Sequence, residues 1–157
     1  MATIHLMTGF MGFGKTTVAK QLETKIPAVC LTHDAFMVKL FGRNMPEEVF
    51  SENFKKVDNV LWTLAEKIIQ SGTDVIMDYG FWTHQARQEA YERARKITDK
   101  VVFHYLFCDM NTAKKRILER TKNALILEKL PALLILAFLF MGIVCSYVDC
   151  ENINSSY

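Results

Sequence analysis

Residues 9–16 read GFMGFGKT and match the pattern G-x-x-x-x-G-K-T. This stretch follows the apolar run 3–8 (TIHLMT), whose length and β-branched content predict a buried strand. It overlaps the start of residues 16–25, whose apolar positions predict a helix. In this context the glycines let successive backbone N–H groups point inward, and the helix N-terminus favours a bound anion. The stretch therefore predicts a phosphate-binding loop (P-loop), and a glycine-rich turn that binds nothing is the weaker alternative.

Two residues at the end of the loop have distinct expected roles. Lys15 is expected to reach the β- and γ-phosphates of a nucleotide, and Thr16 is expected to offer its hydroxyl group to Mg²⁺. A guanine-specific switch would carry an N/T-K-x-D motif, but the nearest stretch, 121–124 (TKNA), lacks the aspartate. We therefore do not expect a GTPase.

Strand and helix patterns alternate along the rest of the chain. Further strands are predicted at 28–32, 74–78 and 101–108. Further helices are predicted from Pro46 to Gly72, over 84–97 and over 112–122, the last opened by Asn111 or Thr112. Four strand–helix repeats predict an α/β fold, a three-layer sandwich with a mostly parallel sheet between helices. Ligands of such sheets bind beyond the carboxyl ends of the strands.

Two carboxylates follow predicted strands at that edge. Asp34 comes just after the second strand, where we expect a base for the hydroxyl group of an acceptor. The alternative is that Asp34 is the N-cap of a helix over 35–41. Asp78 ends the third strand and is the expected acidic partner of the Mg²⁺ held by Thr16. The alternative is that Asp78 caps a helix that begins near Thr83.

A resemblance to a known family rests on four blocks: GFMGFGKTT (9–17), THDAFMVKLFGRNMPEEVF (32–50), LWTLAEKIIQSGTDVIMDYGFWTHQAR (61–87) and CDMNTAKKRILERTKN (108–123). Together they resemble the bacterial AAA_33-type ATP-binding proteins, which are similar to the zeta toxin, chloramphenicol phosphotransferase and polynucleotide kinase group. The resemblance covers roughly residues 1–123. It implies a P-loop NTPase fold with strand order 2-3-1-4-5 and an arginine-bearing lid over the phosphates. If the resemblance ends at residue 123, the last of these strands is missing.

The resemblance also implies an ATP-dependent phosphotransferase with ATP and Mg²⁺ as cofactors. It makes Asp34 and Lys15 catalytic, places Arg116 and Arg120 in the lid helix and puts Arg87 on the acceptor side. Arginine suits phosphate because its rigid fork binds two oxygens, although a solvated helix face is an equal alternative for the two lid arginines. The chain departs from many relatives at Ala35, where they have an acidic residue, and this weakens any inference about acceptor recognition. The residues expected to bind ATP are Gly9, Phe10, Met11, Gly12, Phe13, Gly14, Lys15, Thr16 and Thr17.

Composition further narrows the possible classes of protein and partner. Half of the 157 residues are apolar, as in globular proteins, and the net charge of +2 is too small to predict a double-stranded nucleic acid as partner. The cysteines lack metal-ligand spacing and no secretory signal precedes them, which favours the cytoplasm; they are Cys30, Cys108, Cys145 and Cys150. Structural roles are also expected for the histidines at 33, 84 and 104. Four apolar residues fit either an acceptor pocket or the core: Met11, Phe13, Phe36 and Met37.

The tail, 124–157, differs from the segment before it. It holds one basic and three acidic residues, and its residues 130–148 are 19 in a row without a charge. Three interpretations stay open: a C-terminal membrane anchor with the domain in the cytoplasm, an apolar helix that replaces a missing layer, and a truncated or frameshifted end. A domain over 1–123 followed by this tail is the expected organisation.

These observations predict a P-loop kinase-like protein that transfers the γ-phosphoryl group of ATP to a hydroxyl group of a small or nucleotide-like acceptor. Two alternatives remain. The first is a nucleotide-binding module without transferase activity, and the second is a truncated, inactive kinase with a membrane-inserting tail.

Overall fold

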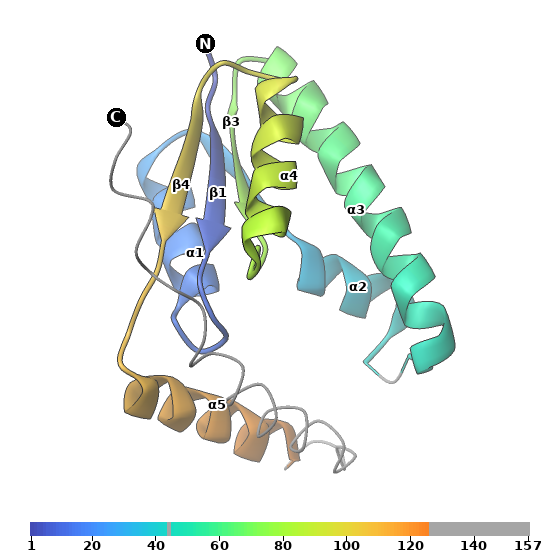
Figure 1. Cartoon of the computed structure of the whole chain (residues 1–157), viewed down its shortest axis with the longest axis vertical. Coiled ribbons are helices and arrows are strands. Elements are labelled where there is room, and N and C mark those ends of the chain that lie inside the picture. Colours follow the sequence, from blue (N-terminus) through green and yellow to red (C-terminus); the bar gives the residue numbers. More distant parts are fainter. Residues whose placement is uncertain (44, 126–157) are drawn as a thin grey trace. The chain divides into compact units, whose positions relative to one another are not determined.

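The computed structural model describes residues 1–43 and 45–125 (Figure 1). Its strands and helices alternate as the sequence predicts, except that two helices, α2 and α3, lie between β2 and β3. They are β1 (Ile4–Thr8), α1 (Lys15–Lys25), β2 (Ala28–Thr32), α2 (His33–Phe41), α3 (Glu47–Gln70), β3 (Asp74–Asp78), α4 (His84–Arg95), β4 (Val101–Tyr105) and α5 (Met110–Leu125). Residues 1–116 form one compact unit, and a second unit begins at Ile117. The predicted domain end at 123 stays a prediction.

The four strands form one parallel sheet with the order β2-β3-β1-β4. This order confirms the predicted α/β class with a parallel sheet for the strands among the described residues. Asp78 at the end of β3 pairs with Met7 of β1 and with Thr32 of β2, so the three strands end at the same edge. The register therefore brings the segments that follow β1, β2 and β3 together, as a parallel sheet requires.

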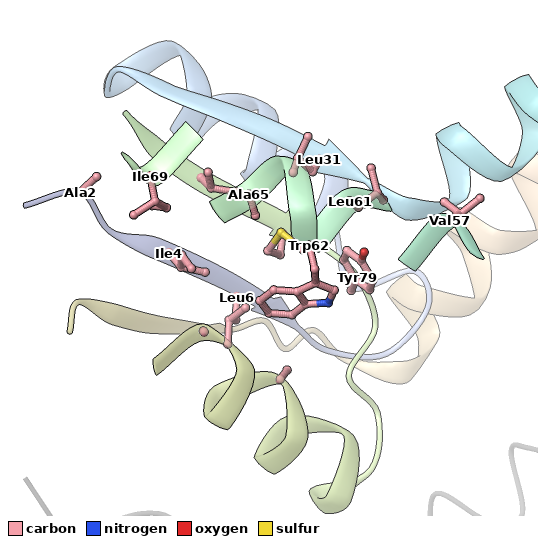
Figure 2. Packing of buried hydrophobic residues seen from close by; sticks show 14 of the residues in the cluster. Ala2, Ile4, Leu6, Leu31, Val57, Leu61, Trp62, Ala65, Ile69 and Tyr79 are labelled. Atoms are coloured by element: carbon pink, nitrogen blue, oxygen red, sulfur yellow. The ribbon is translucent and has the colours of Figure 1, made fainter. Parts of the chain in front are cut away.

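The larger core lies on the face of the sheet covered by α3 and α4 (Figure 1). Figure 2 shows side chains of β1 opposite those of α3, and Trp62 lies among them. Buried apolar residues recur along α3 every four residues, with Trp62 beside Leu61, so one stripe faces the sheet; its buried members are Val57, Leu61, Trp62, Ala65 and Ile69. The first two turns of α3 do not reach the core, and there Phe50 and Phe54 are 48% and 39% exposed.

The opposite face of the sheet is covered by α1. The buried cluster on this face is smaller and is formed by Met7, Ala19 and Ile76, with Val18 and Leu22 packed against it. Alternate side chains of a strand point to opposite faces, so Leu6 and Met7 serve the two different clusters. This arrangement places α1 against β2, β3 and β1.

Two predicted boundaries near the end of the described chain are wrong. The fourth strand ends at Tyr105, because its partner β1 ends at Thr8 and only Leu106 continues the pairing, through its N–H to the Thr8 carbonyl oxygen at 2.9 Å. Helix α5 begins at Met110 and not at residue 112. The Asp109 carboxylate accepts from the Thr112 backbone N–H at 2.9 Å, so Asp109 is the cap and neither residue 111 nor 112 is.

Within the part of the chain that the structure describes, no helix is long and apolar enough to cross a membrane. The candidate anchor over 130–148 lies outside the described residues, as do Cys145 and Cys150.

Candidate functional site

The loop between β1 and α1 owes its course to glycine. Gly9, Gly12 and Gly14 have φ angles of +144°, +82° and +91°, which side-chain-bearing residues rarely adopt. A Cβ atom on Gly9 would lie 2.5 Å from the carbonyl oxygen of Leu106, and one on Gly12 would lie 2.9 Å from that of Ala113. The backbone therefore approaches its neighbours more closely than any side chain allows.

Two cationic side chains contact this loop. The Lys15 ammonium donates to the carbonyl oxygens of Gly9 at 2.9 Å and Phe10 at 3.0 Å. Arg116, on α5, donates from Nη1 to the Gly12 carbonyl oxygen at 3.2 Å. Both side chains can bring positive charge to an anion held by the loop. Arg120 is exposed and belongs to the second unit.

Asp78 is the buried carboxylate of the site, at 5% exposure. Burial raises the pKa of Asp78, and the negative charge of Asp34 raises it further. Hydrogen bonds from Thr16 and Thr32 and the positive charge of Lys15 act in the opposite direction on that pKa. The Thr32 hydroxyl donates to Asp78 Oδ2 at 3.2 Å. Asp78 is thus the group at which residues from the loop, β2 and α2 meet.

The capping alternative for Asp78 is not realised. The helix that begins at His84 is capped by Thr83, whose hydroxyl oxygen accepts from the Ala86 backbone N–H at 3.0 Å. Asp78 lies in β3 and bonds to threonine hydroxyl groups instead.

Asp34 lies in the first turn of α2, which begins two residues earlier than a helix capped by Asp34 would require. Thr32 occupies the N-cap position, so that alternative is also wrong. The Asp34 side chain is exposed, and its charge acts on Asp78. The geometry therefore leaves the Asp34 carboxylate accessible beside the buried one.

A pocket of about 340 Å³ lies between α2 and the start of α3. Residues that line it include His33, Asp34, Met37, Arg43, Phe50 and Phe54. Phe50 and Phe54 are the two residues of the α3 stripe that extend past the core. Of the apolar residues that fit either a pocket or the core, Met37 takes part in both, whereas Phe36 packs against the core.

The segment after β3 is held by Arg87. Its Nη1 donates to the carbonyl oxygens of Phe81 at 3.2 Å and Trp82 at 2.9 Å. Phe81 has a φ angle of +43°, an uncommon conformation for a residue with a side chain. The structure thus gives Arg87 a bracing position, and its predicted role toward an acceptor stays a prediction.

Two aromatic side chains of the loop lie near aromatic residues of other segments. Phe10 lies 6.2 Å from Trp82, and Phe13 lies 5.6 Å from Phe107, measured between ring centroids. Phe13 and Met11 are partly exposed, so neither belongs to the buried clusters.

The comparisons with known proteins agree with this geometry. The model of the AAA_33 family, an AAA domain, matches residues 4–135. The chain belongs to the AAA_33 family. The match to this family extends twelve residues past the expected limit at 123. A search of curated proteins finds no match.

Solved structures share the fold of this AAA_33 domain. A chain of the Pnkp1/Rnl/Hen1 RNA repair complex is 20% identical with a TM-score of 0.67, over 78% of this chain and 38% of that one. A sugar kinase from Janibacter sp. HTCC2649 is 19% identical with a TM-score of 0.54, over 74% and 66%. Kti12 of Chaetomium thermophilum, in complex with ADP-AlF3, is 18% identical with a TM-score of 0.54, over 74% and 68%.

These similarities are too low in identity to show more than the fold. The chain spans 38% of the length of the RNA repair complex chain that it resembles. With the family match, they show that the AAA_33 chain has a P-loop kinase-like, nucleotide-binding fold.

Of the histidines expected to have structural roles, His33 and His104 have local contacts. His33 Nε2 lies 3.2 Å from the Phe54 carbonyl oxygen, and His5 Nδ1 lies 2.9 Å from His104 Nε2. Over residues 1–43 and 45–125, no three histidine, cysteine or acidic side chains group so that they could hold a metal.

The site also includes Thr32 and Arg43, which sequence reasoning missed. Thr32 ends a strand next to the one that ends in Asp78, and only the register could have revealed it.

Proposed function

We propose that this AAA_33 chain transfers the γ-phosphoryl group of ATP to a hydroxyl group of a small or nucleotide-like acceptor. The observation that carries the proposal is the meeting of four groups at one edge of the sheet. Lys15 and Thr16 follow β1, Asp34 follows β2, and Asp78 ends β3. The pKa of Asp78 responds to a hydrogen bond from Thr16 and to the charges of Lys15 and Asp34. Phosphoryl transfer needs cations at the phosphates, oxygen ligands for a metal and a base for the acceptor.

The residues present fit a nucleoside triphosphate with Mg²⁺. The loop has positive φ angles at Gly9, Gly12 and Gly14, and α1 starts directly after it, which suits a bound phosphate group. Thr16 and Asp78 supply the hydroxyl and carboxylate oxygens that Mg²⁺ prefers. When bound, Mg²⁺ supplies positive charge that neutralises the phosphate oxygens.

The protein's own side chains then have separable tasks. Lys15 binds the phosphates, and the guanidinium group of Arg116 adds a second cation near the Gly12 end of the loop. Asp34, exposed beside the pocket, orients the acceptor hydroxyl and takes its proton. Arg120 is proposed as a lid residue on the strength of the resemblance alone.

The proposal is tested with three variants and two measurements. Binding of Mg²⁺·ATP is measured by calorimetry, and transfer is measured as acceptor-dependent release of ADP with a panel of alcohols. Lys15→Met should weaken ATP binding at least about tenfold, because a charge-assisted contact to phosphate is lost. Lys20→Met, at an exposed lysine of the same helix, should leave both measurements unchanged.

Asp34→Asn separates a catalyst from a binding module. We expect it to keep ATP binding and to lose transfer by about 10²–10⁴-fold, the usual contribution of a general base. If the wild-type chain binds ATP but no alcohol increases ADP release, the chain is a nucleotide-binding module and the proposed transfer is wrong. Equal transfer by Asp34→Asn and wild type would remove Asp34 from its role.

A further inference from the structure

The segment that joins β3 to α4 has an uncommon backbone conformation. Phe81 has a φ angle of +43°, which few residues with a side chain adopt. Its ring is anchored, because it stacks on the ring of Tyr79 at 5.1 Å between centroids and packs against the larger core. The indole ring of Trp82 lies over Gly80, where a Cβ atom would collide with it. Such a conformation persists only where the surrounding structure fixes it.

Two polar side chains bond to the carbonyl oxygens of this segment. Arg87 Nη1 donates to the carbonyl oxygens of Phe81 at 3.2 Å and Trp82 at 2.9 Å. The buried hydroxyl group of Thr8 lies 3.4 Å from the Gly80 carbonyl oxygen and 3.3 Å from that of Phe81, so the two oxygens share its one hydrogen. Thr8 ends β1, and the phosphate loop starts at the next residue. The segment is therefore bonded both to α4 and to the start of the loop.

A further contact joins this segment to the phosphate loop itself. The ring centroids of Trp82 and Phe10 are 6.2 Å apart, within the range of interacting aromatic pairs. The carbonyl oxygen of Phe10 accepts from the Lys15 ammonium at 3.0 Å. Trp82 thus lies beside the loop residue whose backbone contacts the phosphate-binding lysine. Arg116 contacts the loop two residues further on, at Gly12.

We infer that Arg87 positions the phosphate loop for the nucleotide by holding the Trp82 ring against Phe10. In this role Arg87 acts through the backbone that it bonds and needs no contact with the nucleotide. A P-loop offers several backbone N–H groups to one phosphate group, so displacement of the Phe10 end weakens that binding. The inference rests on the nucleotide binding that the proposed function requires, and it needs no transfer step.

The test is calorimetry of Mg²⁺·ATP binding to the whole chain and to variants of α4. Arg87→Met should weaken binding about tenfold, a usual size for the coupling between residues in contact. Arg87→Lys keeps a cation that can bond to the same carbonyl oxygens, so it should recover part of the affinity. Arg95→Met is the matched control on the same helix, because Arg95 bonds to Asp99, and it should bind ATP as the wild type does. Wild-type affinity in Arg87→Met would overturn the inference.

A double variant separates positioning through Trp82 from a general loss of structure. Trp82 is 50% exposed, so Trp82→Leu should fold, and it leaves the carbonyl oxygen that Arg87 bonds in place. If Arg87 acts through the Trp82 ring, Arg87→Met should weaken ATP binding little further once Trp82→Leu is present. Losses that multiply in the double variant would overturn the inference. If Arg87→Met does not fold, Trp82→Leu alone decides: it should weaken ATP binding, and unchanged affinity would contradict the inference.

The proposed function can fail separately. ATP binding that depends on Arg87 as expected, without transfer to any alcohol, would support the inference and contradict the phosphotransferase. Transfer by Arg87→Met with the wild-type KM for ATP would overturn the inference and leave the phosphotransferase intact. A wild-type chain that binds no ATP would overturn both.

Discussion

Replacement of Gly9 by alanine should be one of the most destabilising single changes in the described chain. Gly9 has a φ angle of +144°, and a Cβ atom there would lie 2.5 Å from the Leu106 carbonyl oxygen. The unfavourable backbone conformation alone costs about 1–3 kcal/mol. Relief of the contact requires the ends of β1 and β4 to separate, which weakens the Leu106 N–H to Thr8 hydrogen bond, worth about 1 kcal/mol.

The sum, about 2–4 kcal/mol, is a large part of the stability of a domain of this size and corresponds to a fall in Tm of roughly 5–15 °C. The assay is urea denaturation with a parallel thermal melt. Gly72→Ala is the matched control, because Gly72 also has a positive φ angle, +87°, but nothing lies within 4 Å of its Cβ position. It should lose only about 1–2 kcal/mol. If Gly9→Ala loses no more stability than Gly72→Ala, the close approach to Leu106 is refuted.

Three further predictions concern charges. Arg93→Met should lower the free energy of unfolding by about 1 kcal/mol, because it removes the 2.8 Å ion pair with the partly buried Asp58; an unchanged urea midpoint would contradict this. Burial and the neighbouring His5 lower the pKa of His104, so the unfolded chain binds that proton more readily, and stability should fall as the pH drops below about 6.5. His104→Gln should reduce that slope in melts from pH 8 to pH 5. Asp78→Asn should raise Tm at pH 7, because burial raises the Asp78 pKa and disfavours the charge, and the gain should shrink as the pH falls toward about 4.

The loop could be predicted because its requirements are local. Glycines at fixed spacing, a lysine and a threonine determine its chemistry whatever surrounds them, and the flanking strand and helix follow from short patterns. The sheet-facing stripe of α3 was predictable for the same reason. Phe50 and Phe54 follow the same spacing but extend past the sheet, because spacing predicts a face and not where its partner ends.

The contacts across the sheet edge could not be predicted. The hydrogen bond from Thr32 to Asp78 depends on the register of β2 and β3, and the pocket depends on the packing of α2 against α3. The cap of α5 was assigned to the wrong residue because Asp109, Asn111 and Thr112 all have capping side chains, and only the place where β4 leaves the sheet selects Asp109.

The position of β1 in the sheet has a consequence for synthesis. β1 pairs with β3 and β4, which both come much later in the chain. At about 5–20 residues per second, the roughly 100 residues from β1 to the end of β4 take about 5–20 s to translate. During that interval β1 lacks at least one of its two partners, and Leu106 cannot yet bond to Thr8. The nascent chain therefore cannot assemble its phosphate loop early, and nucleotide cannot stabilise it until nearly the whole sheet has emerged from the ribosome.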